Sequence, residues 1–101
     1  MSYFTVAQAG QIPQGSIRVF RVRGKRIAIS HVEGKFYAID DICTHDNGPL
    51  GEGDLQGVEV ECPRHGARFN VRTGEAVSMP AVMSVKVYSV RVQGEEIQLD
   101  V

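Results

Sequence analysis

Hydrophobic and polar residues alternate in short runs along most of this chain. In residues 96–101, Ile, Leu and Val alternate with Glu, Gln and Asp, which is the period-two pattern of a strand with one buried face. Other runs rich in Val, Ile, Phe and Tyr are separated by turn signals at residues 23–25, 33–35, 73–74 and 93–95. No stretch has helical periodicity. The pattern therefore predicts an all-β fold, either an antiparallel sandwich or a small barrel.

Two of the predicted strands change phase midway. In residues 17–22 the apolar positions move from odd to even numbers, and residues 85–92 show the same change. A β-bulge, or burial on both faces, would account for each change. Residues 12–15, Ile-Pro-Gln-Gly, predict a turn before the second strand. His31 falls within the strand pattern of residues 27–32, and we interpret it as an ordinary strand histidine.

Four residues form a pattern typical of a metal site. Cys43 and His45 form C-x-H, and sixteen residues later Cys62 and His65 form C-x-x-H. These include both cysteines of the chain and two of its three histidines. Val58, Val60 and Cys62 alternate with Glu59 and Glu61, so all three would lie on the buried face of one strand. This strand should end at the second ligand loop. We expect a hairpin base to support both ligand loops, which would face each other at one end of the fold.

Mixed thiolate and imidazole ligands allow two interpretations. One is a mononuclear Cys2His2 zinc site. The other is a [2Fe-2S] cluster with two cysteines on one iron and two histidines on the other. Zinc fingers usually pair ligands of one type in each half of the site, whereas here each half supplies one Cys and one His. The mixed halves favour the diiron cluster, because both loops then reach both metals.

The residues around these ligands resemble the cluster-binding region of Rieske-type ferredoxins, the small soluble electron carriers of bacterial ring-hydroxylating oxygenase systems. The resemblance runs over essentially the whole chain. Its most specific stretches are residues 43–45, 62–69, 72–75 and 79–81. It implies a single Rieske domain over residues 1–101, with a two-loop cluster-binding part at about residues 40–82. One [2Fe-2S] cluster per chain would be held by Cys43, His45, Cys62 and His65.

The resemblance also implies a function. The chain would carry one electron at a time from a flavin-containing ferredoxin reductase to a terminal oxygenase or similar enzyme. It would not be an enzyme by itself, since the sequence has no nucleophile and base pair and no further cofactor motif. Two alternatives remain open. One is a small Rieske subunit of a larger oxidoreductase, such as an assimilatory nitrite reductase, and the other is a zinc-stabilised interaction module.

Comparison with other Rieske proteins suggests a low reduction potential. High-potential relatives carry a serine after the glycine of the second motif and a tyrosine two residues later, and both donate hydrogen bonds to sulfur. This chain has Ala67 and Phe69 there, so we predict a potential of about −150 mV. Gly66 is expected to let the backbone approach the cluster, and Pro80 matches the loop that shields it. Gly48 and Arg64 occupy the places of the disulfide cysteines of membrane-anchored relatives.

Composition and charge limit the other classes of protein. The chain has 101 residues, a formal net charge of −1 and a pI near 6.3, and without a basic run it does not resemble a nucleic-acid-binding protein. It contains neither an apolar run of about 20 residues nor a signal-like start, so we expect a cytoplasmic protein with no membrane association. Between residues 36 and 63 there are seven acidic residues and no Lys or Arg. These charges either steer docking onto a basic partner or are solvated hairpin charges that lie close to Arg64, Arg68 and Arg72.

Overall fold

Residues 3–42, 49–63, 66–77 and 83–101 are described by a computed structural model of the chain. They form one short 3-10 helix, Ala9–Gln11, and ten strands. The strands are β1 (Tyr3–Gln8), β2 (Ile17–Val22), β3 (Lys25–Val32), β4 (Lys35–Asp40), β5 (Asp54–Gln56), β6 (Glu59–Glu61), β7 (Arg68–Asn70), β8 (Val87–Tyr88), β9 (Val90–Gln93) and β10 (Glu96–Asp100). No helix in these ranges is long and apolar enough to cross a membrane.

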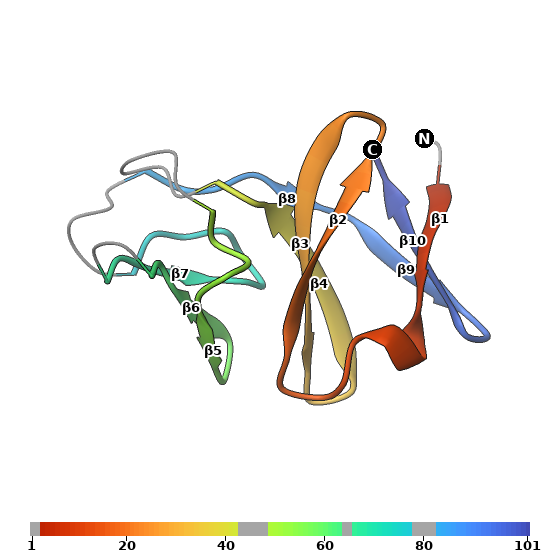
Figure 1. Cartoon of the computed structure of the whole chain (residues 1–101), viewed down its shortest axis with the longest axis horizontal. Coiled ribbons are helices and arrows are strands. Elements are labelled where there is room, and N and C mark those ends of the chain that lie inside the picture. Colours follow the sequence, from red (N-terminus) through yellow and green to blue (C-terminus); the bar gives the residue numbers. More distant parts are fainter. Residues whose placement is uncertain (1–2, 43–48, 64–65, 78–82) are drawn as a thin grey trace.

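The strands form three antiparallel sheets that lie side by side in Figure 1. The terminal sheet has the order β1-β10-β9, the central sheet has the order β2-β3-β4-β8, and the hairpin sheet has the order β5-β6-β7. Figure 1 shows the central sheet between the other two, with the hairpin sheet at the left end of the molecule. The predicted all-β antiparallel fold is confirmed.

The central sheet is buried on both of its faces. In β3, the four consecutive residues 27–30 are fully buried, as expected for a strand covered on each side. One face and the hairpin sheet share a core that we call the site-side core, which contains Ile17, Ala28, Ile39, Leu50, Val60, Cys62, Ala67, Phe69 and Val71 among others. The other face and the terminal sheet share the terminal-side core, which contains Ile12, Val22, Ile27, Ile29, Ala38, Tyr88, Ile97 and Leu99 among others. Burial of each large aliphatic side chain contributes about 1.5–3 kcal/mol to folding.

The two phase changes have different physical causes. Strand β2 pairs with β3 in unbroken register, but Ile17 packs into the site-side core and Val22 into the terminal-side core. Burial on both faces therefore explains the first change. The second occurs where the chain leaves the central sheet after Tyr88 and enters the terminal sheet at Val90. The register shift characteristic of a bulge lies in β1 instead, between Thr5 and Ala7.

The predicted turns are present in the described ranges. Arg23 and Gly24 have φ values of 53° and 80°, and Glu33 and Gly34 have values of 49° and 79°. Positive φ at both central residues of a two-residue loop suits the right-handed twist of a hairpin. In the turn before β2, the Ser16 N–H donates to the Pro13 carbonyl at 3.0 Å. These turns place β2, β3 and β4 as adjacent strands.

His31 is an ordinary strand histidine, as predicted. It lies in β3, and its Nδ1–H donates to the Ile12 carbonyl at 2.8 Å. Its ring stacks on Phe36, with 4.1 Å between the ring centroids. The imidazole is therefore engaged in local contacts within the scaffold.

Candidate metal centre

Cys62, the described ligand of the second segment, lies at the end of the hairpin formed by β6 and β7. Glu61 pairs with Arg68 at the ends of the two strands. Beyond this pair, the Cys62 N–H donates to the Ala67 carbonyl at 2.7 Å and the Gly66 N–H donates to the Cys62 carbonyl at 3.0 Å. Two backbone hydrogen bonds thus fix the position of Cys62 at the base of its loop.

Gly66 is required by backbone conformation. Its φ is 76°, in the region that glycine adopts at little steric cost. A Cβ at this position would meet no described atom within 4 Å. The positive φ explains this glycine, while its expected closeness to a cluster stays a prediction.

Cys62 is almost completely buried, with 1% of its surface exposed. It belongs to the site-side core together with Leu50, Ala67 and Phe69, and it forms no disulfide. The prediction that Cys62 faces the core on the same side as Val58 and Val60 is confirmed. A buried thiol on a rigid hairpin turn suits a metal thiolate, because the surrounding apolar side chains exclude water from the sulfur.

The base of the first ligand segment is held by Asp41, whose side chain is fully buried. Its Oδ2 accepts hydrogen bonds from Arg26 Nε at 3.0 Å and Nη2 at 2.8 Å, and its Oδ1 accepts one from the Gly51 N–H at 2.6 Å. The Asp41 N–H also donates to the Arg26 carbonyl at 3.0 Å. One carboxylate therefore joins the start of the segment, its end, and strand β3.

Two glycines let the end of this segment pack closely against the scaffold. A Cβ on Gly51 would collide with Val19 Cγ2, and a Cβ on Gly53 would collide with the Glu61 carbonyl. The Gly53 N–H donates to the carbonyl of Leu50, which is fully buried. The first segment thus returns to the scaffold beside Glu61, the residue that precedes Cys62.

Residues on either side of positions 78–82 are tied to the same hairpin region. The Val77 N–H donates to the Arg68 carbonyl at 2.8 Å, and the Val85 N–H donates to the Gly74 carbonyl at 2.7 Å. Gly74 has a φ of 80°, and a Cβ there would collide with the Val85 carbonyl. Hydrogen bonds and tight packing therefore fix the chain on both sides of this segment.

Only one of the four predicted ligands lies within the described residues. Cys43, His45 and His65 fall outside them, as do Gly48, Arg64 and Pro80. Within the described ranges, no group of three His, Cys, Asp or Glu side chains could hold a metal ion. Cys62 and the fixed ends of the segments fit a thiolate-bound cluster, and the full ligand set stays a prediction.

The expectation that a hairpin base supports both loops is wrong for the first loop. Strands β6 and β7 form such a base for the second loop. Strands β4 and β5 belong to different sheets, so the first segment crosses from the central sheet to the hairpin sheet. Strand parity shows which residues face a core, but it does not show which strand lies next to which.

Most of the described acidic residues between positions 36 and 63 have partners. Arg68 lies 3.1 Å from Glu61 and 3.7 Å from Glu59, measured between guanidinium nitrogen and carboxylate oxygen. Asp41 binds Arg26, and Asp40 accepts a hydrogen bond from the Tyr88 hydroxyl. Asp46 lies outside the described residues. For Glu59 and Glu61 the structure therefore favours hairpin charges paired with an arginine over a free acidic patch.

Sequence reasoning missed two polar pairs beside the site. Arg26 and Asp41 are fifteen positions apart, and Asp40 and Tyr88 are forty-eight apart. The only available signal was a pair of aspartates directly after the buried strand β4. Burial raises the pKa of Tyr88 above its ordinary value, and the hydrogen bond to Asp40 and its negative charge raise it further.

The sequence matches the family described as Rieske [2Fe-2S] domain over residues 2–89. The ferredoxin component of a naphthalene 1,2-dioxygenase system from Pseudomonas aeruginosa is 40% identical over 90 residues, which cover 89% of this chain and 86% of the relative. The solved ferredoxin of carbazole 1,9a-dioxygenase from Nocardioides aromaticivorans IC177 has a TM-score of 0.93 at 34% identity, covering 98% of this chain and 97% of that one. A chain in the solved complex of reduced oxygenase and oxidized ferredoxin in carbazole 1,9a-dioxygenase has a TM-score of 0.89 at 38% identity. The match covers 96% of this chain and 91% of that one.

The chain belongs to the Rieske [2Fe-2S] domain family. Within it, the chain is an electron-carrying ferredoxin rather than a catalytic component. The predictions of the family, the [2Fe-2S] cofactor and the electron-transfer role are confirmed, and the zinc interpretation is no longer needed.

Proposed function

We propose that this ferredoxin carries single electrons from a flavin-containing reductase to a terminal oxygenase. Cys43 and Cys62 would bind one iron of the cluster, and His45 and His65 would bind the other. The buried Cys62 thiol at the base of a hydrogen-bonded hairpin turn is the observation that carries the ligand assignment. The partner assignment is supported by relatives that are named ferredoxin components of dioxygenase systems.

A cluster of this type supplies reversible one-electron transfer, at a potential raised by its neutral imidazole ligands. The chain's own residues would keep the site rigid while its charge changes. Asp41 holds both ends of the first segment, and the backbone bonds of Cys62 hold the second. The site-side core keeps water from the Cys62 sulfur. Such a site reorganises little on reduction. This suits a carrier that accepts an electron from one partner and donates it to another.

The proposal includes the extent and location of the domain. Residues 1–101 form one Rieske domain, with residues of about 40–82 forming its cluster-binding part. We place the protein in the cytoplasm as a soluble carrier. The hairpin sheet and the two segments that would carry the ligands belong to this part of the chain.

Electron paramagnetic resonance of the reduced protein tests the ligand assignment. We expect the wild-type signal to have an average g value below that of four-cysteine clusters. Replacing His45 or His65 with alanine should abolish that signal and the visible colour, because one iron loses a ligand. His31→Ala is the matched control, since the described contacts of His31 are with Ile12 and Phe36 of the scaffold, and it should retain the signal.

Electron transfer itself is tested by stopped-flow reduction of the loaded protein by a purified ferredoxin reductase, followed by reoxidation with a terminal oxygenase. Both steps should proceed in the wild-type protein. Stable copurification with a large catalytic chain would instead indicate a fixed subunit and contradict the role of a mobile carrier.

A further inference from the structure

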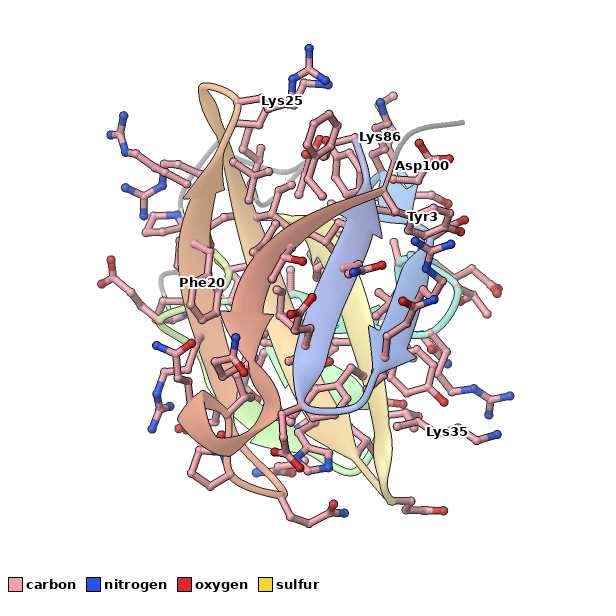
Figure 2. The ribbon with its side chains drawn as sticks, turned by 90° about the vertical axis from the view of Figure 1, so that its right-hand side faces the viewer. Tyr3, Phe20, Lys25, Lys35, Lys86 and Asp100 are labelled. Carbon is pink, nitrogen blue, oxygen red and sulfur yellow. The ribbon has the colours of Figure 1, made fainter. Side chains whose placement is uncertain are left out.

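A hollow of about 420 Å³ lies beside the start of the first ligand segment. Its lining includes Lys25, Arg26, Asp40, Ile42, Lys86 and Tyr88, and we call it the basic hollow. Figure 2 shows Lys25 and Lys86 near each other at one end of the view, with Lys35 at the opposite end. The hollow joins the turn between β2 and β3 to strand β8.

The carboxylates at the basic hollow are already engaged by neighbouring groups. Asp41 neutralises Arg26, and Asp40 accepts the Tyr88 hydroxyl hydrogen bond at 2.5 Å. The ammonium groups of Lys25 and Lys86 lie 5.8 Å and 5.0 Å from the centroid of the Tyr88 ring. In the described part of the chain, neither lysine forms an ion pair with a carboxylate. Two ammonium groups therefore face the hollow against the single charge of Asp40.

One partly exposed apolar side chain also lines the basic hollow. Ile42 is 43% exposed, and it directly precedes the predicted ligand Cys43 in the chain. A hollow whose charges are mostly of one sign attracts oppositely charged groups of a partner. A partner seated here would contact the residue adjacent to the first ligand segment.

We propose that the basic hollow is a docking site for a redox partner whose surface presents carboxylate side chains. This inference rests on the proposed electron-transfer function and adds the charge of the partner surface. The carboxylates would lie between Lys25 and Lys86, and an apolar partner side chain would cover Ile42. Complementary charges of this kind raise the rate of encounter, and the effect weakens as salt is added.

The basic hollow and the acidic run of residues 36–63 would attract partner surfaces of opposite charge. A partner that docked on that run would have to be basic. Arg68 already pairs with Glu59 and Glu61, which reduces the negative potential of the hairpin face. Charge reversal at the basic hollow should therefore slow electron transfer to the partner it binds.

Stopped-flow kinetics with the cluster-loaded protein test the proposal. The probes are the purified reductase and terminal oxygenase of a naphthalene 1,2-dioxygenase system, each mixed separately with the protein. The double variant Lys25→Glu with Lys86→Glu should exchange electrons about tenfold more slowly with at least one probe at low salt. The difference should shrink at high salt. The visible spectrum and the reduction potential should stay those of the wild-type protein.

The single variants Lys25→Glu and Lys86→Glu are compared with Lys35→Glu, which makes the same charge change as each of them at the opposite end of the view in Figure 2. This control makes half the charge change of the double variant. It should alter the rate less than twofold. Carbodiimide cross-linking of the wild-type protein to the slowed partner should join Lys25 or Lys86 to a partner carboxylate.

Two results would overturn the inference. If the double variant matched the Lys35→Glu control with both probes, the basic hollow would have no role while the carrier function stood. If the double variant were faster, the partner surface would be basic. Wild-type protein that exchanged electrons with neither probe would refute docking to components of this type and the proposed site with it, while the electron-carrying role would stand.

Discussion

The hydrogen bond between Tyr88 and Asp40 has a consequence at alkaline pH. Burial, with help from Asp40, raises the pKa of Tyr88, so the folded protein holds this proton more tightly than the unfolded chain does. The stability from this shift is fully present below about pH 10, the pKa of an unperturbed tyrosine, and is lost as the pH rises toward the folded-state pKa.

We therefore expect the free energy of unfolding of wild-type protein to fall above pH 10 more steeply than that of Tyr88→Phe, by about 1.4 kcal/mol per pH unit. Urea denaturation of both proteins between pH 8 and pH 11.5 measures the difference. Parallel curves for the two proteins would contradict it.

The buried alanine at position 67 allows a test of how a hydroxyl donor would change the reduction potential. Ala67 is fully buried beside Cys62 in the site-side core. Ala67→Ser would place a hydroxyl near the predicted cluster sulfurs and stabilise the reduced, more negative form. A preference of about 1 kcal/mol for that form raises the potential by about 40 mV. Redox titration followed by visible absorbance measures the shift.

Ala38→Ser is the control for this change, since Ala38 is equally buried but lies in the terminal-side core. It should lower stability and leave the potential unchanged. Equal potentials for wild-type protein and Ala67→Ser would show that residue 67 does not influence the sulfurs.

Individual residues could be predicted where one local rule governed them. Cys62 followed the alternation of its strand, and His31 followed its own strand pattern, so both were predicted correctly. Asp41 was missed as the link between the ends of the first segment, because its partners Arg26 and Gly51 become neighbours only after the sheets have formed. The three ligands outside the described residues stay predictions.

At the scale of the elements, Asp41 determines how the first ligand segment is anchored. Asp41→Ala removes the partner of Arg26 and leaves the Gly51 N–H without its acceptor. We expect a loss of about 3 kcal/mol in the free energy of unfolding. The cluster should also be lost more readily to a chelator. Denaturant unfolding and the decay of visible absorbance measure the two effects.

Asp54→Ala is the matched control, because Asp54 is an exposed acidic residue on the edge strand β5. It should change stability by less than about 0.5 kcal/mol. A similar effect of the two substitutions would mean that the Asp41 contacts contribute nothing specific.

The strands were predictable to different degrees. Strand β10 follows a simple alternation, since Ile97 and Leu99 are buried and the three residues that alternate with them are not. The phase change in β2 was ambiguous, because burial in two cores and a bulge produce the same sequence pattern. The true register shift in β1 left no such signal. The crossing from β4 to β5 was also missed, because it depends on how whole sheets pack.

For the whole molecule, removal of the cluster should affect one end more than the other. Metal binding stabilises the folded form that holds the ligands. Stripping the cluster with a chelator under reducing conditions should lower Tm. The Cys62 and Gly66 amides should then exchange hydrogen faster, while amides of β3 and β10 stay protected by the terminal-side core. Hydrogen exchange of loaded and stripped protein measures this contrast, and a uniform loss of protection would contradict it.

The family could be predicted from the four-ligand pattern because a metal site restricts both residue type and spacing. The charge of a docking face could not be predicted in the same way. Four of the described acidic residues between positions 36 and 63 find partners in Arg26, Arg68 and Tyr88, all of which lie outside that stretch. The electrostatic potential of a face depends on these long-range pairs, which only the folded structure reveals.

The pairing of β1 with β10 brings Tyr3 opposite Asp100, and Figure 1 marks both chain ends on the same side of the molecule. A short linker could therefore join the two ends, and new ends could be opened at the β9–β10 turn, where Gly94 has a φ of 61°. Such a circular permutant would offer a fusion point on the terminal sheet, away from the hairpin sheet. A protein fused there would leave the hairpin sheet uncovered.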